Sequence, residues 1–391
     1  MVDFREATPD ELEAWDDLTV HVGGGHVYQS RAWAEQRATS GWRPAFLMGS
    51  DGSAVLALCR AWPVIGGAGA YLPRGPVPAG SAEAMAARLR GAATWLAAHG
   101  ADVVASDAEV PRDAGYTELL TAAGFHPIPE IQPSRHRMSL PLAGFDEAAI
   151  RAGLTKSARQ RIASAERDGL AVIRHDRGGA PADDLFRAPV VDPGIAFEAF
   201  SRLLIATGER VGFRIGDRAA FVDWWTRAHA AGHLILLEAV ADTAAGGAAA
   251  GAAAGGAAPP SVSGTAGVAG TDASQIAGLV LYRHGGRLTT VHSADDPVAR
   301  RDHPGLMHLL RWRAIQLALR EGRAEMDLGG VDVAPDHGEP APGSPTHGLY
   351  EHKRSFGARW VTMSGAHERI VRPWRYQAGR VTSRLVGLAR R

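Results

Sequence analysis

The stretch QIAGLVLYRHGGRLTTVH, residues 275–292, decides the fold class. Two runs rich in apolar and β-branched residues, 275–283 and 287–292, flank the turn His-Gly-Gly at 284–286. Such runs, separated by a few residues that include glycine, are typical of an antiparallel β-hairpin. The apolar run 233–241 predicts a further strand before the hairpin. The second half of the chain is therefore expected to contain an antiparallel sheet.

The elements that follow this hairpin have counterparts in the first half of the chain. Residues 305–321 predict a helix that ends before a glycine, and residues 325–328 predict a strand. In the first half, an Asp-Gly turn predicts a hairpin within 45–63, followed by an Ala-rich helix over 81–99 and a strand at 102–106. Mixed helices and strands in this repeated order predict an α/β protein built from a duplicated unit.

The repeated order also divides the chain. We expect a first domain of residues 1–144, completed by about 367–391, and a second domain of residues 145–366. The second domain is interrupted at about 242–272 by a segment dominated by Ala and Gly. Such a segment has too few bulky side chains to offset the entropy of ordering, so we expect a disordered loop there.

Composition excludes several classes of protein. The 391 residues are 46% hydrophobic, and 42 Lys and Arg balance 42 Asp and Glu, which excludes a disordered chain and a globally basic nucleic-acid binder. The single cysteine, Cys59, has no partner within the chain, and the charged start of the sequence has no apolar run behind it. We expect a cytoplasmic protein that could also touch the cytoplasmic face of the membrane.

Only two of the 42 basic residues are lysine, Lys156 and Lys353. A bias toward arginine of this size indicates that lysine persists by chance or where a compact ammonium does something that a planar guanidinium cannot. Lys353 is the strongest single candidate, because it stands beside aromatic residues such as Phe356 and just before the turn at Gly357. No His, Cys, Asp and Glu cluster has metal-ligand spacing, so we expect no metal site.

Other candidate binding residues lie on predicted helices. Ser30 predicts the cap of a helix that carries Trp33 and Arg37 one turn apart, either as an ordinary buried helix or as a helix that faces a ligand. Lys156 and Arg159 share a stripe of a predicted helix over 146–168, which is either a solvated basic face or a contact for phosphate.

Two arginines stand in a predicted loop between helices. Arg210 and Arg214 lie in the segment Glu-Arg-Val-Gly-Phe-Arg, where they are either surface residues or ligands for phosphate. The strand end Met-Asp-Leu-Gly-Gly, residues 326–330, is either a turn or a place where a ligand approaches the backbone closely.

Taken in order, these segments resemble the Fem family of peptidoglycan-bridge aminoacyltransferases. The resemblance spans almost the whole chain. The sequence shows no long helical-hairpin insertion, and in this respect it resembles the shorter, FemX-like branch of the family. The segments that carry it are Gln29-Ser30 with Trp33, Leu72-Pro73-Arg74-Gly75-Pro76, Lys156 with Arg159, Ile162, Ala165 and Gly169, the helix 304–321, Asp327-Leu328-Gly329-Gly330, and His352-Lys353 with Phe356-Gly357.

The resemblance implies a fold, a reaction and roles for residues. The fold is a tandem of two acetyltransferase-like (GNAT) domains, with the C-terminal end packed on the first. Lys353 falls on the family's lysine that stabilises the reaction centre. Arg37 falls where the family can carry a lysine to the diphosphate of a nucleotide-linked precursor. A phosphate-binding arginine of the family falls near Gly216, so Arg210 and Arg214 are its candidate replacements.

The implied reaction joins an amino acid from aminoacyl-tRNA to an amine of the stem peptide of a peptidoglycan precursor. The resemblance implies aminoacyl-tRNA as co-substrate, no further cofactor, and a precursor that is nucleotide-linked or lipid-linked. Arg74, in its Pro-Arg-Gly-Pro turn, is a candidate for substrate binding. The chemistry asks the protein to position an activated ester and an amine and to stabilise an oxyanion.

Two other functions stay open at this stage. A CoA-dependent N-acyltransferase could use the same fold, but Pro304 stands where its pyrophosphate loop usually has a glycine and removes a backbone donor. A non-catalytic tRNA-binding or membrane-surface protein could use the tail 367–391, with its seven arginines and the single acidic Glu368. Its apolar spacing predicts an amphipathic helix that docks on the first domain, on tRNA or on an anionic membrane.

Overall fold

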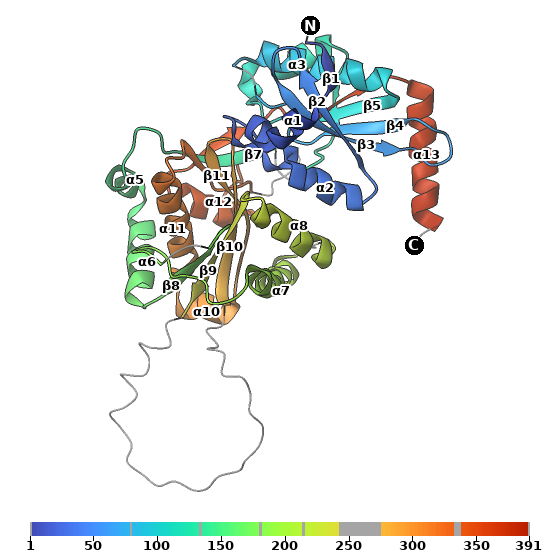
Figure 1. Ribbon diagram of the computed structural model, residues 1–391. Helices are drawn as coiled ribbons and strands as arrows, with labels where there is room; N and C mark the ends of the chain where they lie inside the picture. The colour runs from blue at the N-terminus through green and yellow to red at the C-terminus, as the bar shows by residue number, and fades with distance from the viewer. Residues whose placement is uncertain are drawn as a thin grey trace, which may run out of the picture.

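The computed structural model describes residues 2–78, 80–132, 135–179, 182–212, 216–241, 275–331 and 338–389. Within these ranges the chain forms two domains, each built on a mixed sheet with helices against it (Figure 1). The predicted α/β class and the duplicated unit are confirmed. The segment 242–272, predicted to be disordered, lies outside the described residues.

The first sheet has the strand order β1-β2-β3-β4-β5-β14-β6. Its strands are β1 (Phe4–Glu6), β2 (Arg43–Gly49), β3 (Ala54–Ala61), β4 (Ala68–Leu72), β5 (Ala101–Ser106), β6 (His126–Pro127) and β14 (His367–Ile370). The hairpin predicted from the Asp-Gly turn is formed by β2 and β3, which pair antiparallel. The next two strands, β4 and β5, are parallel, so the chain crosses over between them through helix α3 (Ala82–Ala98).

The second sheet has the order β13-β7-β12-β11-β10-β9-β8. Its strands are β7 (His136–Pro141), β8 (Ala171–His175), β9 (Leu234–Val240), β10 (Gln275–His284), β11 (Arg287–Asp295), β12 (Glu325–Asp327) and β13 (Arg359–Thr362). The decisive hairpin is β10 and β11, and its turn uses positive φ angles of 56° at Gly285 and 80° at Gly286. Glycine adopts these angles without the steric cost of a Cβ atom.

Helices cover both faces of the second sheet, because its central strands are apolar on both sides. Leu234, Leu236 and Val280 pack against α7 and α8, whereas the alternate residues Ile235 and Leu237 pack on the side of α11 and α6. The helices of this domain are α5 (Glu147–Gly153), α6 (Lys156–Arg167), α7 (Pro193–Val211), α8 (Arg218–Ala230), α10 (Pro297–Asp302), α11 (Leu306–Arg320) and α12 (His347–Arg354).

The prediction of a single helix over 146–168 is wrong in one respect, because this segment forms two helices, α5 and α6. Leu154 takes an extended conformation with ψ 147°. The hydroxyl of Thr155 then accepts a hydrogen bond from the backbone N–H of Ala158 at 3.2 Å and caps a new helix. Lys156 is consequently the first residue of α6 rather than a residue in the middle of a long helix.

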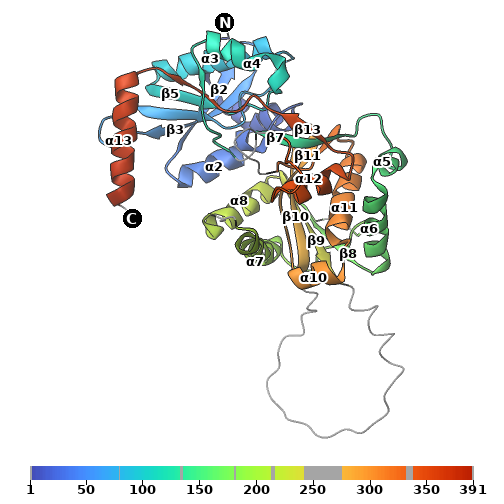
Figure 2. The ribbon, with the colours of Figure 1, turned by 180° about the vertical axis from the view of Figure 1, so that it is seen from behind.

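Helices of the first domain are α1 (Pro9–Glu13), α2 (Arg31–Thr39), α3, α4 (Tyr116–Ala122) and α13 (Pro373–Ala389). The last of these follows β14 and lies at the ends of β3 and β5 (Figure 2). It is tied there by Arg375, whose Nε lies 3.4 Å from Oδ1 of the buried Asp102 in β5. No helix within the described ranges combines the length and the apolar composition needed to cross a membrane.

Strand pairing places the division between the two domains slightly earlier than the expected boundary at residue 144. The strand β7, which precedes that residue, pairs with β12 and β13 of the second sheet. In the other direction, β14 returns from the second domain and inserts between β5 and β6 of the first sheet. The chain therefore crosses between the domains twice.

Candidate active site

The decisive hairpin also joins the two domains. Its turn reaches the loop that precedes α2, where Gly285 donates its N–H to the carbonyl oxygen of Val20 at 2.7 Å and accepts from Gly24 at 3.2 Å. A ring nitrogen of His284 lies 2.8 Å from the carbonyl oxygen of Gly25. A Cβ atom at position 285 would run into the backbone of Gly25, so only glycine fits this approach.

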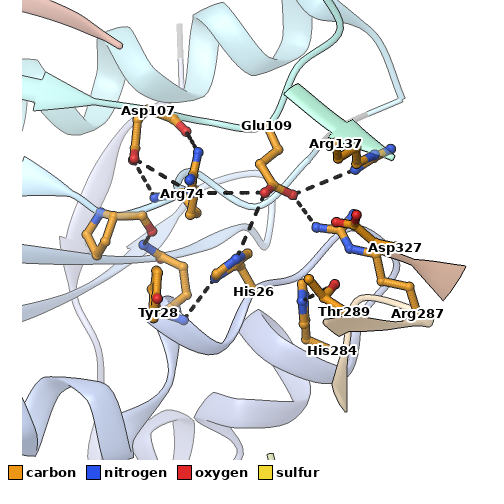
Figure 3. Close-up of polar contacts among 12 residues, drawn as sticks. His26, Tyr28, Arg74, Asp107, Glu109, Arg137, His284, Arg287, Thr289 and Asp327 are labelled. Atoms are coloured by element: carbon orange, nitrogen blue, oxygen red, sulfur yellow. Dashed lines mark hydrogen bonds and ion pairs between the residues drawn. The ribbon is translucent and has the colours of Figure 1, made fainter. Parts of the chain in front are cut away.

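Polar side chains from both domains meet beside this turn (Figure 3). Glu109, from the loop after β5, lies at the centre. Its Oε2 pairs with Nη2 of Arg287 and lies 3.7 Å from Nη1 of Arg137, both on strands of the second sheet. Its Oε1 lies 4.0 Å from Nε of Arg74 and 4.0 Å from Nε2 of His26, both in the first domain. Glu109 is therefore shared by the two domains.

Charge compensation governs this interdomain cluster. Burial favours the neutral form of Glu109, but the surrounding cations, Arg287 first, hold its pKa well below the usual range. The neighbouring Asp107 accepts the main-chain N–H of Arg74 at 2.7 Å and the hydroxyl of Tyr71 at 3.0 Å. Burial nonetheless raises the pKa of Asp107. Removing a single charge from such a buried cluster leaves its partners uncompensated.

Lys353, near the end of α12, is buried with 4% of its surface exposed. Its Nζ donates hydrogen bonds to the carbonyl oxygens of Gly329 at 2.9 Å and of Gly330 at 2.6 Å. Burial lowers its pKa well below the usual range, the guanidinium of Arg311 adds to this effect, and the carboxyl of Asp327 opposes it. The side chain is thus held by two backbone hydrogen bonds at the end of β12, where burial disfavours its charged form.

The pairing of β12 with β11 ends at the same place. Strand β12 runs parallel to β11 over only three residue pairs, the last being Thr289 with Asp327, while β11 continues to Asp295. Beyond Thr289, no strand in the described part of the chain pairs with this edge of β11. Backbone groups at such an edge can bind an extended substrate. Lys353 therefore lies where β12 stops pairing with β11.

Asp327 lies close enough to act on both Lys353 and the interdomain cluster. Its Oδ1 accepts the N–H of Gly329 at 2.8 Å, and burial raises its pKa to about 6, against the opposing effects of Arg287 and Arg137. The same carboxyl opposes the fall in the pKa of Lys353. One buried acid thus acts electrostatically on both groups.

A second set of basic side chains packs behind Lys353. Arg311 on α11 is buried, and its Nε donates to Nε2 of His352 at 2.9 Å. Burial lowers the pKa of Arg311 to about 10 and that of His308 to about 4. Phe356, predicted to bind substrate, is buried against both histidine rings, with centroids 5.5 and 5.7 Å away. It packs the core around Lys353.

Arg37 and Trp33 lie on α2 and contact each other, with the guanidinium of Arg37 5.4 Å from the ring of Trp33. The ring of Trp33 packs 4.8 Å from that of Trp224 on α8, so it is part of the domain interface. The guanidinium of Arg37 lies 5.5 Å from the ring of Trp42, which Arg60 also approaches at 5.6 Å. Burial lowers the pKa of Arg37, and the nearby Arg60 adds to this.

Trp42 and Arg60 also line a cavity of about 630 Å³ in the first domain. Tyr71 forms part of its wall, and the hydroxyl of this residue bonds Asp107 of the interdomain cluster. Ser383 and Val386 of α13 form another part. The cavity thus lies between strands β3 and β4 and the C-terminal helix, and Tyr71 connects its wall with Asp107.

The remaining predicted residues are more scattered. Lys156 is exposed at the start of α6. This end of α6 lies next to the end of α12, because the N–H of Thr155 donates to the carbonyl oxygen of Ser355 at 2.9 Å. Arg159 donates to main-chain carbonyls at the end of α5, one of them that of Ala152 at 3.2 Å, which gives it a structural role. Arg210 pairs with Asp295 at 3.2 Å, and Arg214 lies outside the described residues.

The sequence analysis did not assign Glu109, Arg137, Arg287 or His26 to the site. The only local signal for Glu109 is that it and Asp107 are two acidic residues directly after a buried strand. Asp327 was noted only as part of a Gly-Gly turn. Within the described residues, no group of three His, Cys, Asp or Glu side chains could hold a metal ion.

The two sheets and the hairpin that joins them define a tandem acetyltransferase-like fold, as expected. No model of a protein family matches the sequence, and no curated protein matches it. Among solved structures, the crystal structure of FemX is similar over 96% of this chain and 99% of its own, with a TM-score of 0.73 and 18% identity. At the level of the fold, the resemblance to the Fem family is confirmed.

A second solved structure shares the fold more distantly. The structure of L-PGS from Bacillus licheniformis is similar over 99% of this chain and 98% of its own. The TM-score is 0.51 and the identity 11%. Both comparisons extend over the two domains together, so the tandem arrangement as a whole is shared.

Proposed function

We propose that this protein transfers an amino acid from aminoacyl-tRNA to an amine of the stem peptide of a peptidoglycan precursor. The observation that carries the proposal is the placement of Lys353 where β12 stops pairing with β11, with its Nζ held by two backbone carbonyls. The fold similarity to FemX across nearly the whole of both chains supports it.

In this proposal Lys353 stabilises the transition state. The acceptor amine attacks the ester carbon of the donor, and the carbonyl oxygen gains negative charge. Two N–H groups of the ammonium are engaged by Gly329 and Gly330, so the third can donate to that oxyanion. Collapse of the intermediate forms the amide, expels the ribose hydroxyl of the tRNA, and passes the amine's proton to the leaving oxygen or to water. A donor fixed in advance contributes about 10²–10³-fold to the rate.

The acceptor is proposed to bind on the side of the first domain. The cavity of about 630 Å³ offers the guanidinium of Arg60 beside the rings of Trp42 and Trp62, a combination that suits a phosphate next to a ring or sugar. The guanidinium of Arg37 contacts the same Trp42 ring. Both nucleotide-linked and lipid-linked precursors carry phosphate, so these contacts serve either one.

The donor is proposed to approach from the second domain. Lys156 is exposed at the first turn of α6, and α6 adjoins the end of α12 through the bond between Thr155 and Ser355. A basic residue at this position would contact the phosphate backbone of the tRNA near its acyl end. The ester is already activated, so the proposed reaction uses no cofactor beyond this co-substrate.

The CoA-dependent alternative finds less support at α11. A helix N-terminus that binds pyrophosphate must present free N–H groups in an open space. Here the residue before α11, Gly305, approaches the carbonyl oxygen of Arg161 on α6 so closely that a Cβ atom would collide with it. The approach from that side is therefore occupied by protein.

The proposal is tested by incubating the protein with a mixed pool of charged tRNA and, separately, nucleotide-linked and lipid-linked precursors. Mass spectrometry should find one acceptor heavier by a single aminoacyl residue. That experiment also identifies the amino acid and the acceptor. Products that form equally without protein, or no product with either acceptor, would overturn the proposal.

A further inference from the structure

The helix α13 presents an apolar stripe to solvent, which is unusual for a helix packed on a domain. Trp374, Val381 and Leu385 are 71%, 56% and 60% exposed. They stand at positions i, i+7 and i+11, so they share one face of the helix. An exposed stripe of this kind marks an interaction surface rather than a packing surface.

The opposite face of α13 packs on the first domain. Tyr376 is buried, and its hydroxyl donates to Oε1 of Glu368 at 3.0 Å. Gly379 faces the ring of Trp62, where a Cβ atom would collide with the indole. Since this face and Arg375 already fix the helix to the first domain, the exposed stripe is not needed to hold it.

A further exposed apolar side chain lies in the link between β3 and β4, which adjoins α13. Val64, in the link between β3 and β4, is 94% exposed and has a φ of 73°. A β-branched residue rarely takes this left-handed conformation, which is strained. The link is next to α13, because a Cβ atom at Gly66 would lie 3.7 Å from Nη2 of Arg375. The turn thus holds a valine in solvent on the border of the helix.

The charge of α13 identifies the partner. The helix Pro373–Ala389 contains three arginines and no acidic residue. Arg380 and Arg384 are exposed on the turns that carry Val381 and Leu385. A basic helix with a Trp, Val and Leu stripe matches an anionic bilayer, where the apolar residues enter the interface and the arginines meet headgroups. A tRNA backbone would use the arginines but leave the stripe in water.

We propose that α13, with Val64, docks this protein on an anionic membrane surface. Ser383 and Val386, on the other side of the same helix, line the cavity of the first domain, so docking would bring that cavity within one helix diameter, about 10 Å, of the bilayer. This geometry favours a lipid-linked acceptor, a consequence that rests on the proposed function. The docking itself does not, and the experiment below measures it without turnover.

The test is sedimentation of the full-length protein with vesicles. We expect binding to equimolar phosphatidylglycerol and phosphatidylcholine, and little binding to phosphatidylcholine alone. The triple variant Trp374→Ser, Val381→Ser and Leu385→Ser should bind at least about 10-fold more weakly, and the variant Arg380→Gln with Arg384→Gln should lose about 5-fold per arginine. Melting temperatures should stay unchanged, because all these side chains are exposed.

A matched control changes three exposed apolar residues of the second domain, Val190, Val191 and Ile195, to serine. This variant should bind vesicles like the wild type. Equal loss in both triple variants, or binding that does not depend on phosphatidylglycerol, would overturn the proposal. So would a dimer in solution that the α13 variant abolishes, or a loss of tRNA binding in the arginine variant with vesicle binding intact.

Discussion

The ammonium of Lys353 lies 2.6 Å from the carbonyl oxygen of Gly330, a residue just beyond the last strand pair between β11 and β12. A buried lysine normally pairs with a carboxylate, because an isolated charge is costly to desolvate. Here the bonds are to backbone carbonyls, and Asp327 acts only at longer range. The two backbone partners fix the direction of the side chain and, in the proposed function, leave its third N–H for the substrate.

Lys353→Met should lower kcat by about 100-fold, because it removes the proposed oxyanion donor while keeping a similar shape. Lys353→Arg should fail nearly as badly, since the planar group cannot occupy the position of an ammonium. Steady-state kinetics and melting curves would measure both.

The same residue predicts a pH effect. The pKa of Lys353 is lowered, and the donor role requires the protonated form, so the wild-type rate should fall as the pH rises through that lowered pKa. A rate that instead rises with pH in that range would assign Lys353 to proton abstraction, contrary to the proposed role.

Asp327→Asn should change how stability depends on pH. Burial raises the pKa of Asp327 in the folded protein to about 6, whereas an unfolded aspartate titrates near about 4. The folded state therefore binds more protons between these values, and wild-type stability should fall by about 3 kcal/mol as the pH rises from about 4 to about 6. The asparagine variant lacks this loss. Urea unfolding at several pH values would check it, and a constant difference between the two proteins would contradict it.

Glu109→Gln should destabilise the protein by about 3–5 kcal/mol, because Arg74, Arg137 and Arg287 would lose the carboxylate that they share. Chemical denaturation measures the change. The matched control is Glu11→Gln, since Glu11 pairs with Arg5 at 2.7 Å on the surface, where loss of an ion pair has little effect. Equal effects of the two substitutions would show that the interdomain cluster is not stabilising.

Gly329→Ala should be more damaging than Gly286→Ala, although the two residues have similar φ angles of 76° and 80°. Alanine costs about 1–2 kcal/mol at either position from the backbone alone. At position 329 the new Cβ atom would also collide with the carbonyl oxygen of Thr290 and stand 3.5 Å from Nζ of Lys353, whereas nothing lies within 4 Å at position 286. Melting temperature and kcat should therefore both fall further in the first variant.

The fold could be predicted where its signals are local. Alternating apolar runs around Gly285 and Gly286 predicted the hairpin, and it is present as β10 and β11. The break between α5 and α6 was missed because a Thr cap inside a helical pattern competes with continuation of the helix. Only the backbone at Leu154, extended in the structure, shows which of the two prevails.

The site was less predictable, because tertiary contacts assemble it. The scarcity of lysine in the sequence singled out Lys353, and in the structure its side chain is buried. Glu109 and Arg287, by contrast, are 178 residues apart in sequence and meet only because the hairpin turn packs on the first domain. The sequence also did not indicate that the guanidinium of Arg159 bonds a carbonyl at the end of α5, and its predicted role in substrate binding stays a prediction.

The most direct test of the proposed function compares two acyl donors with the same acceptor. The protein should be given a stem-peptide acceptor with either purified aminoacyl-tRNA or acetyl-CoA, and the product masses compared. We predict an acceptor heavier by one aminoacyl residue with the tRNA, lost when the tRNA is first digested with ribonuclease, and no product with acetyl-CoA. An acetylated acceptor with acetyl-CoA, and none from aminoacyl-tRNA, would contradict the proposed function.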